Sequence, residues 1–376
     1  MQDGEPRAPE PRTAEPIARD VPPLARLDDR SLVERLDPQG LLGRIVALPD
    51  QCEEAWQGAT GLQLPDGYAD AREVVVLGMG GSAISGDILR SLADVSGERA
   101  VSVVRGYDLP SFAGEQTVVI ACSHSGDTEE TLSAFEQAVE RNARTVVVTT
   151  GGRLLSRARE VGIPALAYEY DGEPRSALGH QLMRLLAIGE RLRLVAPQAE
   201  AVAEAVRLMR EQRTRLEIAV PARENAAKQL AARLHGRLPL VIGSGVLAQA
   251  AHRWKTQLNE NAKIWSLCEE LPELDHNAVV GFGLPAGIAG SVHAVFLWHA
   301  PLHPRMRLRY EATAEELERA GVSHERVEAL GSSPLAQALT AVFLGDLVSY
   351  YLALLYDVQP SPVAPIDRLK EKLAQA

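Results

Sequence analysis

Residues 73–92 read EVVVLGMGGSAISGDILRSL, and this stretch decides the fold class of the chain. Its four consecutive apolar residues, Val74–Leu77, are typical of a buried strand. The three glycines that follow predict a tight turn, and the amphipathic segment after Ser82 predicts a helix. A strand that enters a helix through a glycine turn is the repeating unit of parallel α/β sheets.

The same pattern recurs along the chain. Strand, turn and helix are predicted again in residues 117–143, 144–168 and 238–263. Further strands are expected in AVSVVRGY (100–107) and GIAGSVHAVFLWHA (287–300), and a largely buried helix in residues 333–356. The sequence therefore predicts an α/β protein with two similar doubly wound domains, each a mainly parallel sheet flanked by helices.

Four regions are predicted from the composition of the segments. Residues 1–27 contain six prolines and several acids without an apolar core, which is typical of a disordered tail. A first domain is expected over 28–195, a helical connection over 196–236, and a second domain with a C-terminal helix over 237–376.

The composition of the chain argues against several classes of function. The formal net charge of −11 argues against a broad nucleic-acid surface, which needs a basic face. The three cysteines, Cys52, Cys122 and Cys268, are far apart and have no C-x-x-C spacing, so we expect neither disulfides nor zinc. The tail does not resemble a signal peptide, and no uncharged apolar run of about 18 residues is apparent. We therefore expect a soluble cytoplasmic protein with no membrane segment and no metal.

The glycine turn after residue 77 admits a dinucleotide interpretation, because Gly78, Gly80 and Ala83 nominally fit G-x-G-x-x-G/A. The next predicted strand, however, ends in Arg105 and Gly106 instead of the acidic residue that would bind a ribose. The phosphate-loop pattern G-x-x-x-x-G-K-[ST] is absent. A plain tight turn with a serine cap remains the alternative.

The segment SHSGDTEET (123–131) favours a phosphate site. Ser123, Ser125 and Thr128 follow a strand and precede a helix, at the edge of the sheet where ligands of α/β proteins bind. Hydroxyls and helix N-terminal amides can hold a phosphate without a cation. A helix cap alone would explain one hydroxyl and not three. Asp127 lies in the same loop, where its carboxylate would repel a phosphate unless it points away or pairs with a cation.

Four motifs together resemble the sugar isomerase (SIS) family, and within it the bifunctional phosphoglucose/phosphomannose isomerases. They are GMGGSAISGD (78–87), SHSGDTEET (123–131), EPRSALGH (173–180) and NENAK…LPELDHN (259–277). The resemblance covers residues 27–373. It implies interconversion of glucose 6-phosphate, mannose 6-phosphate and fructose 6-phosphate through a cis-enediolate. It also implies no cofactor, no metal, and a homodimer in which each subunit gives a histidine to the other's site.

The resemblance also implies roles for single residues. Glu260 matches the general base, His276 the ring-opening group, and Arg175 the cation that faces the enediolate. Lys370, in the closing segment QPSPVAPIDRLKEKL (359–373), matches a further lysine of the site. Read alone, these would be a helix glutamate paired with Lys263, a loop histidine, a salt-bridge arginine and a solvated lysine.

The substrate phosphate is expected on Ser82, Ser123, Ser125 and Thr128, with Gly80 and Gly81 close to the substrate. Similar enzymes have a threonine near the C-terminus that is thought to allow both epimers to react, and Ser361 is the nearest match. Two alternatives stay open: a non-catalytic sugar-phosphate sensor, and an isomerase restricted to glucose and fructose phosphates.

Overall fold

Two parallel sheets form the frame of the protein. The computed structural model describes residues 23–97, 99–300 and 302–375. The first sheet has the order β2-β1-β3-β4-β5 and the second the order β7-β6-β8-β9, and neighbouring strands in both run parallel. The strands of the first sheet are β1 (Glu73–Leu77), β2 (Val101–Val104), β3 (Thr117–Ser123), β4 (Arg144–Thr149) and β5 (Ala165–Ala167). Those of the second are β6 (Leu238–Ser244), β7 (Leu267–Leu271), β8 (Val292–Trp298) and β9 (Ser323–Glu328).

Helices cover both sheets, as expected for strands that are apolar on both faces. The first half contributes α2 (Ser31–Leu36), α3 (Leu41–Val46), α4 (Leu48–Ala59), α5 (Gly80–Ser96), α6 (Glu129–Glu140), α7 (Gly152–Glu160) and α8 (Leu178–Arg191). The second half contributes α9 (Ala199–Leu216), α10 (Ala226–Leu234), α11 (Val246–Glu260), α12 (Pro304–Arg319), α13 (Pro334–Leu355) and α14 (Ala364–Leu373). The α/β class and the two parallel sheets confirm the fold predicted from the sequence.

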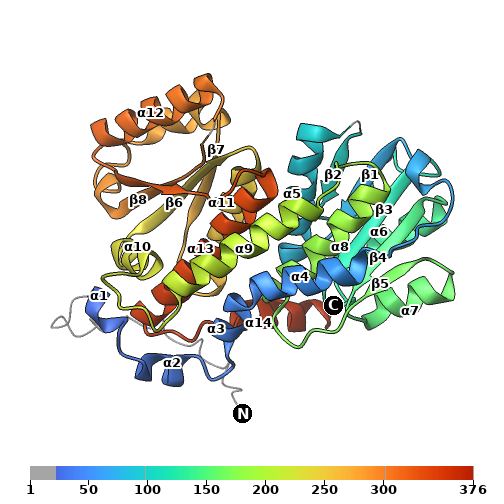
Figure 1. Ribbon diagram of the computed structural model, residues 1–376, viewed down its shortest axis with the longest axis horizontal. Coiled ribbons are helices and arrows are strands. Elements are labelled where there is room, and N and C mark those ends of the chain that lie inside the picture. The colour runs from blue at the N-terminus through green and yellow to red at the C-terminus, as the bar shows by residue number, and fades with distance from the viewer. Residues whose placement is uncertain (1–22, 98, 301, 376) are drawn as a thin grey trace, which may run out of the picture.

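Long helices lie between the two sheets. Figure 1 shows the sheets as two separate lobes, with α9, α11 and α13 running through the middle of the molecule. Helix α13 packs against α9, α10 and α11, and α11 packs against α5 of the first half. One continuous apolar core contains residues of α4, α5, α8, α9, α11 and α13. The C-terminal end of α11, which carries Glu260, is therefore held beside the first half.

Helix α13 is long and apolar enough to cross a membrane, which the sequence did not lead us to expect. Its most apolar 18-residue window has a mean hydropathy of 1.7 and is completely buried within the protein. Such burial is typical of a core helix that is apolar all round.

The predicted tail lies mostly outside the described residues. Its last part differs from the prediction, because Pro23–Arg26 form the short helix α1 and Leu27 is only 1% exposed in the core. Arg26 also donates a hydrogen bond to the carboxylate of Asp357 at 2.7 Å. This segment is ordered because the Leu27 side chain packs in the core and Arg26 pairs with Asp357.

Candidate active site

Two loops with hydroxyl groups lie next to each other at the carboxyl edge of the first sheet. β1 and β3 are hydrogen-bonded neighbours with Leu77 opposite Ala121, so the turns that follow them leave the sheet at the same level. A Cβ added to Gly78 would lie 3.2 Å from the carbonyl oxygen of Cys122, which shows how closely the two turns approach. The structure therefore brings Ser82 and Ser123 to one edge of the sheet.

The loop after β3 is closed by its own hydroxyls. The Ser123 and Thr128 hydroxyl oxygens are 2.9 Å apart, and the amide of Gly126 donates to Ser123 Oγ at 3.0 Å. The Ser125 hydroxyl accepts a bond from the amide of Asp127 at 3.2 Å. Gly126 has φ of +74°, and a Cβ there would lie 1.9 Å from the Gly151 carbonyl oxygen, so only glycine fits.

Two helices begin at this edge without a side-chain cap among the described residues. The N-cap residues are Met79 for α5 and Thr128 for α6, and neither side chain accepts a bond from the first-turn amides. Ser82 lies in the first turn of α5, and its hydroxyl accepts a bond from Gln181 Nε2 at 2.9 Å. Amides at helix N-termini carry partial positive charge and bind anions readily. Because the Thr128 side chain accepts no bond from the first turn of α6, a helix cap does not account for its hydroxyl.

Asp127 is paired with a cation. Its Oδ1 accepts bonds from the backbone amide of Arg153 at 3.1 Å and from Arg153 Nε at 3.2 Å. The backbone amide belongs to the first turn of α7, where a carboxylate is stabilised by the helix dipole. The loop carboxylate is thus balanced by Arg153 and by α7.

This pairing predicts that Asp127 has little effect on phosphate binding. For Asp127→Asn we expect KM for a sugar phosphate, the substrate class that the resemblance implies, to change by less than about threefold, since exposed ion pairs at the surface are worth little. Steady-state kinetics at low and at high salt checks this. A fall in KM of about tenfold or more would mean that the carboxylate does repel the phosphate despite Arg153.

Arg175 lies at the centre of a second group of residues. It is 5% exposed and belongs to the short helix η2 (Pro174–Ser176). Its Nε donates to Asn261 Oδ1 at 2.8 Å, and its Nη2 donates to the carbonyl oxygens of Pro360 and Ser361, each at 2.9 Å. Burial lowers the pKa of Arg175, although Glu260 and Glu173 oppose that effect, and an arginine stays charged under such conditions. A buried, fixed cation is suited to stabilising a developing negative charge.

Glu260 is the carboxylate next to this cation. It is the last residue of α11, its Oε2 lies 3.5 Å from Arg175 Nη1, and its side chain is 28% exposed. The same helix is anchored by Arg253, which donates to the Arg175 carbonyl oxygen at 2.9 Å and pairs with Asp346 of α13. Glu260 is thus partly accessible and held by a rigid helix, as a general base should be.

The phosphate edge and the Arg175 group are adjacent. A Cβ added to Gly81 would lie 3.3 Å from the Pro174 carbonyl oxygen and 3.7 Å from the Cα of Arg175. Gly80, at the start of α5, has φ of +50°. The start of α5 therefore packs on the backbone of η2, and this contact places Gly80, Gly81 and Ser82 beside the residues predicted to act on the sugar.

His276 and Lys370 are not brought into this group. His276 ends the short helix η3 (Glu273–His276) after β7 and is exposed, and its side chain makes no hydrogen bond or ion pair within the described residues. Lys370 is exposed on α14, a helix without any buried residue. Ser361, in contrast, is 5% exposed and lies next to Glu173. Burial raises the pKa of that carboxylate, but the Ser361 and Arg44 side chains together lower it.

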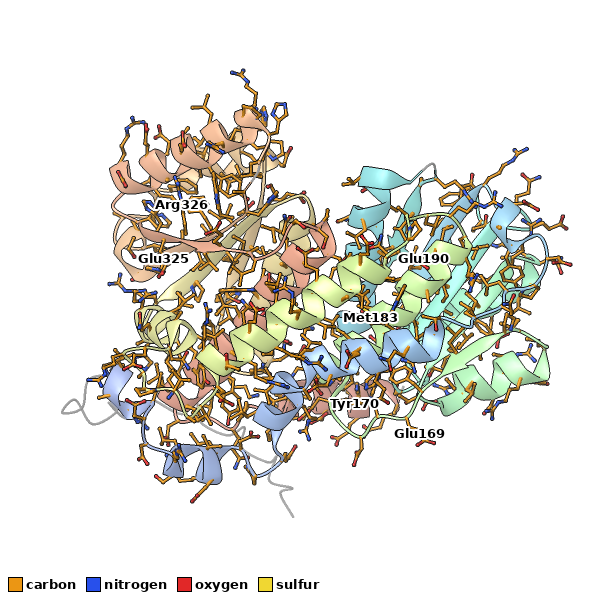
Figure 2. All side chains as sticks on the ribbon, viewed as in Figure 1. Glu169, Tyr170, Met183, Glu190, Glu325 and Arg326 are labelled. Carbon is orange, nitrogen blue, oxygen red and sulfur yellow. The ribbon has the colours of Figure 1, made fainter. Side chains whose placement is uncertain are left out.

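Several residues of the site were not predicted from the sequence. Asn261 adjoins Glu260 in the NENAK motif, and its Nδ2 donates to Ser349 Oγ at 2.9 Å while its oxygen accepts from Arg175. Tyr170 lies beside α4 (Figure 2), and its hydroxyl donates to the Ser176 carbonyl oxygen at 3.1 Å. Only Asn261 had a sequence signal, its place beside the predicted base. The carbonyl of Pro360 had none, because every residue has a backbone carbonyl. Tyr170 had none, because it contacts Ser176 behind the site and belongs to no motif.

Comparisons with known proteins match both halves of the chain. A family model of the SIS domain matches residues 67–167, and a model of the bacterial phospho-glucose isomerase C-terminal SIS domain matches residues 223–373. A bifunctional phosphoglucose/phosphomannose isomerase of Caldicellulosiruptor bescii is 36% identical over 87% of this chain and 97% of the relative. A bifunctional phosphoglucose/phosphomannose isomerase of Aquifex aeolicus is 34% identical over 80% of this chain and 90% of the relative. The crystal structure of a hypothetical protein from Thermus thermophilus has the same fold, with a TM-score of 0.70, 18% identity, and 94% of both chains covered.

Proposed function

The chain belongs to the sugar isomerase (SIS) family, and on that premise we propose that it interconverts glucose 6-phosphate, mannose 6-phosphate and fructose 6-phosphate. It is an isomerase, like the curated relatives that match it over most of its length. The observation that carries the proposal is the placement of Glu260 and buried Arg175 3.5 Å apart, beside the uncapped start of α5.

The proposed reaction runs through a cis-enediolate. Glu260 takes the proton from C2 of the aldose and returns it to C1, while the hydroxyl proton moves from O2 to O1. Arg175 stabilises the negative charge that develops on these two oxygens in the enediolate. The phosphate is bound by Ser82, Ser123, Ser125 and Thr128 and by the amides at the starts of α5 and α6. Support for this arrangement comes from the shared sheet edge and from the contact of Gly81 with η2.

A homodimer would complete the site. Ring opening needs a group that transfers a proton to and from the ring oxygen, and we assign it to His276 of a second copy. Three observations support this: His276 and Lys370 are exposed, and α14 has an uncovered apolar face formed by Ile366, Leu369 and Leu373. The spacing of these three residues puts them on one side of the helix.

We also propose a cytoplasmic location. The three cysteines are free, which supports it.

The test is an incubation of the purified protein with fructose 6-phosphate, with both aldose phosphates measured over time. We expect glucose 6-phosphate and mannose 6-phosphate to appear together, because the Ser361 hydroxyl lies in the segment that contacts Arg175. Glucose phosphate alone would restrict the enzyme to one epimer. Binding of fructose 6-phosphate without turnover, detected by calorimetry, would contradict catalysis and indicate a sensor.

A further inference from the structure

Lys263 lies three residues beyond Glu260, at the point where the chain leaves α11. Its φ is +59°, a left-handed conformation that glycine adopts more easily than any other residue. The amide of Ile264 donates to the Leu258 carbonyl oxygen at 3.4 Å, which closes the end of the helix. The backbone here would accept glycine, so the lysine side chain is not explained by the turn itself.

The Lys263 ammonium binds two carbonyl oxygens from distant segments. It donates to the Pro360 oxygen at 2.9 Å and also to the Glu260 oxygen at the end of α11. The Pro360 oxygen accepts a second bond, from Arg175 Nη2 at 2.9 Å. Two cations from different parts of the chain therefore hold one carbonyl group. Partial loss of hydration, reinforced by the charge of Arg175, lowers the pKa of Lys263 to about 8.

The Pro360 carbonyl matters because it anchors the C-terminal segment of the chain. Pro360 and Ser361 are buried, but α14, which begins at Ala364, has no buried residue. The segment that carries Ser361 and leads to Lys370 is thus tied to the rest of the described protein chiefly at Pro360 and Ser361. Through the Glu260 carbonyl, the same lysine is joined to the end of the helix that carries the proposed base.

We propose that Lys263 is a positioning residue for the isomerisation: it fastens the Pro360–Ser361 segment to the end of α11, and so fixes Ser361 and α14 relative to Glu260 and Arg175. The proposal rests on the proposed function for its kinetic effect. Its structural part, the fastening of residues 359–373, stands independently of whether the protein turns over sugar phosphates.

The experiment compares Lys263→Met, Lys263→Gly and Lys263→Arg with the wild-type full chain. The first two lose the ammonium, and glycine also relaxes the backbone. The third keeps a cationic donor. We measure amide hydrogen exchange of residues 361–373 without substrate, and kcat and KM for fructose 6-phosphate. Lys255→Met, on the same helix, is the matched control.

We expect Lys263→Met and Lys263→Gly to exchange α14 amides about tenfold faster and to lower kcat about tenfold, since a bond to a charged donor is lost. KM should change by less than about threefold, and Lys263→Arg should recover most of both effects. Unchanged exchange in Lys263→Met would overturn the proposal, as would a loss of kcat without faster exchange. If the wild type has no turnover, the proposed function fails while the exchange data still decide the fastening.

Discussion

Replacing Glu260 by glutamine is expected to lower kcat for fructose 6-phosphate by about 10³-fold, because general-base catalysis contributes about 10²–10⁴-fold to such reactions. Glutamine has the same size as glutamate and can still accept a bond from Arg175 Nη1, which lies 3.5 Å from the carboxylate. It cannot take a proton from the sugar. KM should stay within about threefold of the wild-type value, since the proposed phosphate site, at the starts of α5 and α6, does not include Glu260.

The control for this variant is Glu211→Gln, which removes another helical carboxylate, one that pairs with Arg207 on the surface of α9. It should leave kcat unchanged, because surface pairs of this type contribute little. Thermal unfolding of Glu260→Gln should occur within a few degrees of the wild type. If the variant kept more than a tenth of the wild-type kcat, Glu260 would not be the base.

The fold was predictable because its signals are local. Val74–Leu77 and the glycines after them fix a strand and a turn within a few residues, and the pattern recurs along the chain. Pairing between distant residues is different. Asp127 was suspected of repelling phosphate, but its charge is balanced by Arg153, 26 residues away, and no spacing in the sequence indicates that pair.

The side chains of the candidate site were named from the resemblance to a known family. Its backbone hydrogen-bond acceptors were not, because no motif marks them. Glu260 and Arg175 were named from motifs, and the structure places them together. The carbonyl of Pro360 accepts bonds from both Arg175 and Lys263. Because every residue type has such a carbonyl, this contact has no sequence signature. The catalytic roles of Glu260 and Arg175 stay predictions, and so do those of His276 and Lys370, which are exposed in the single chain.

Replacing Arg253 by methionine is expected to destabilise the whole protein. Arg253 is 2% exposed and donates to both carboxylate oxygens of Asp346, at 3.1 Å from Nε and 2.6 Å from Nη2. Removing one partner of a buried pair costs about 3–5 kcal/mol, because the other charge is left without compensation. For a chain of this size the midpoint of thermal unfolding should fall by roughly 4–6 °C. Calorimetry or circular dichroism measures it.

The reason for the large effect is that the pair joins α11 to α13, and both helices lie between the two sheets (Figure 1). A double-mutant cycle separates the charge from the packing. Arg253→Met with Asp346→Leu removes both charges, and replacement of a buried pair by apolar residues is often neutral. The double variant should therefore unfold at a higher temperature than Arg253→Met alone.

Arg207→Met is the control, because its pair with Glu211 is exposed and should shift the midpoint by no more than about 2 °C. Arg253 also donates to the Arg175 carbonyl oxygen, so the double variant has a second use. If it recovers stability but not kcat, then the bond from Arg253 to the backbone of η2 orients Arg175 for the reaction, independently of holding α11 to α13. Full recovery of both would assign Arg253 to stability alone.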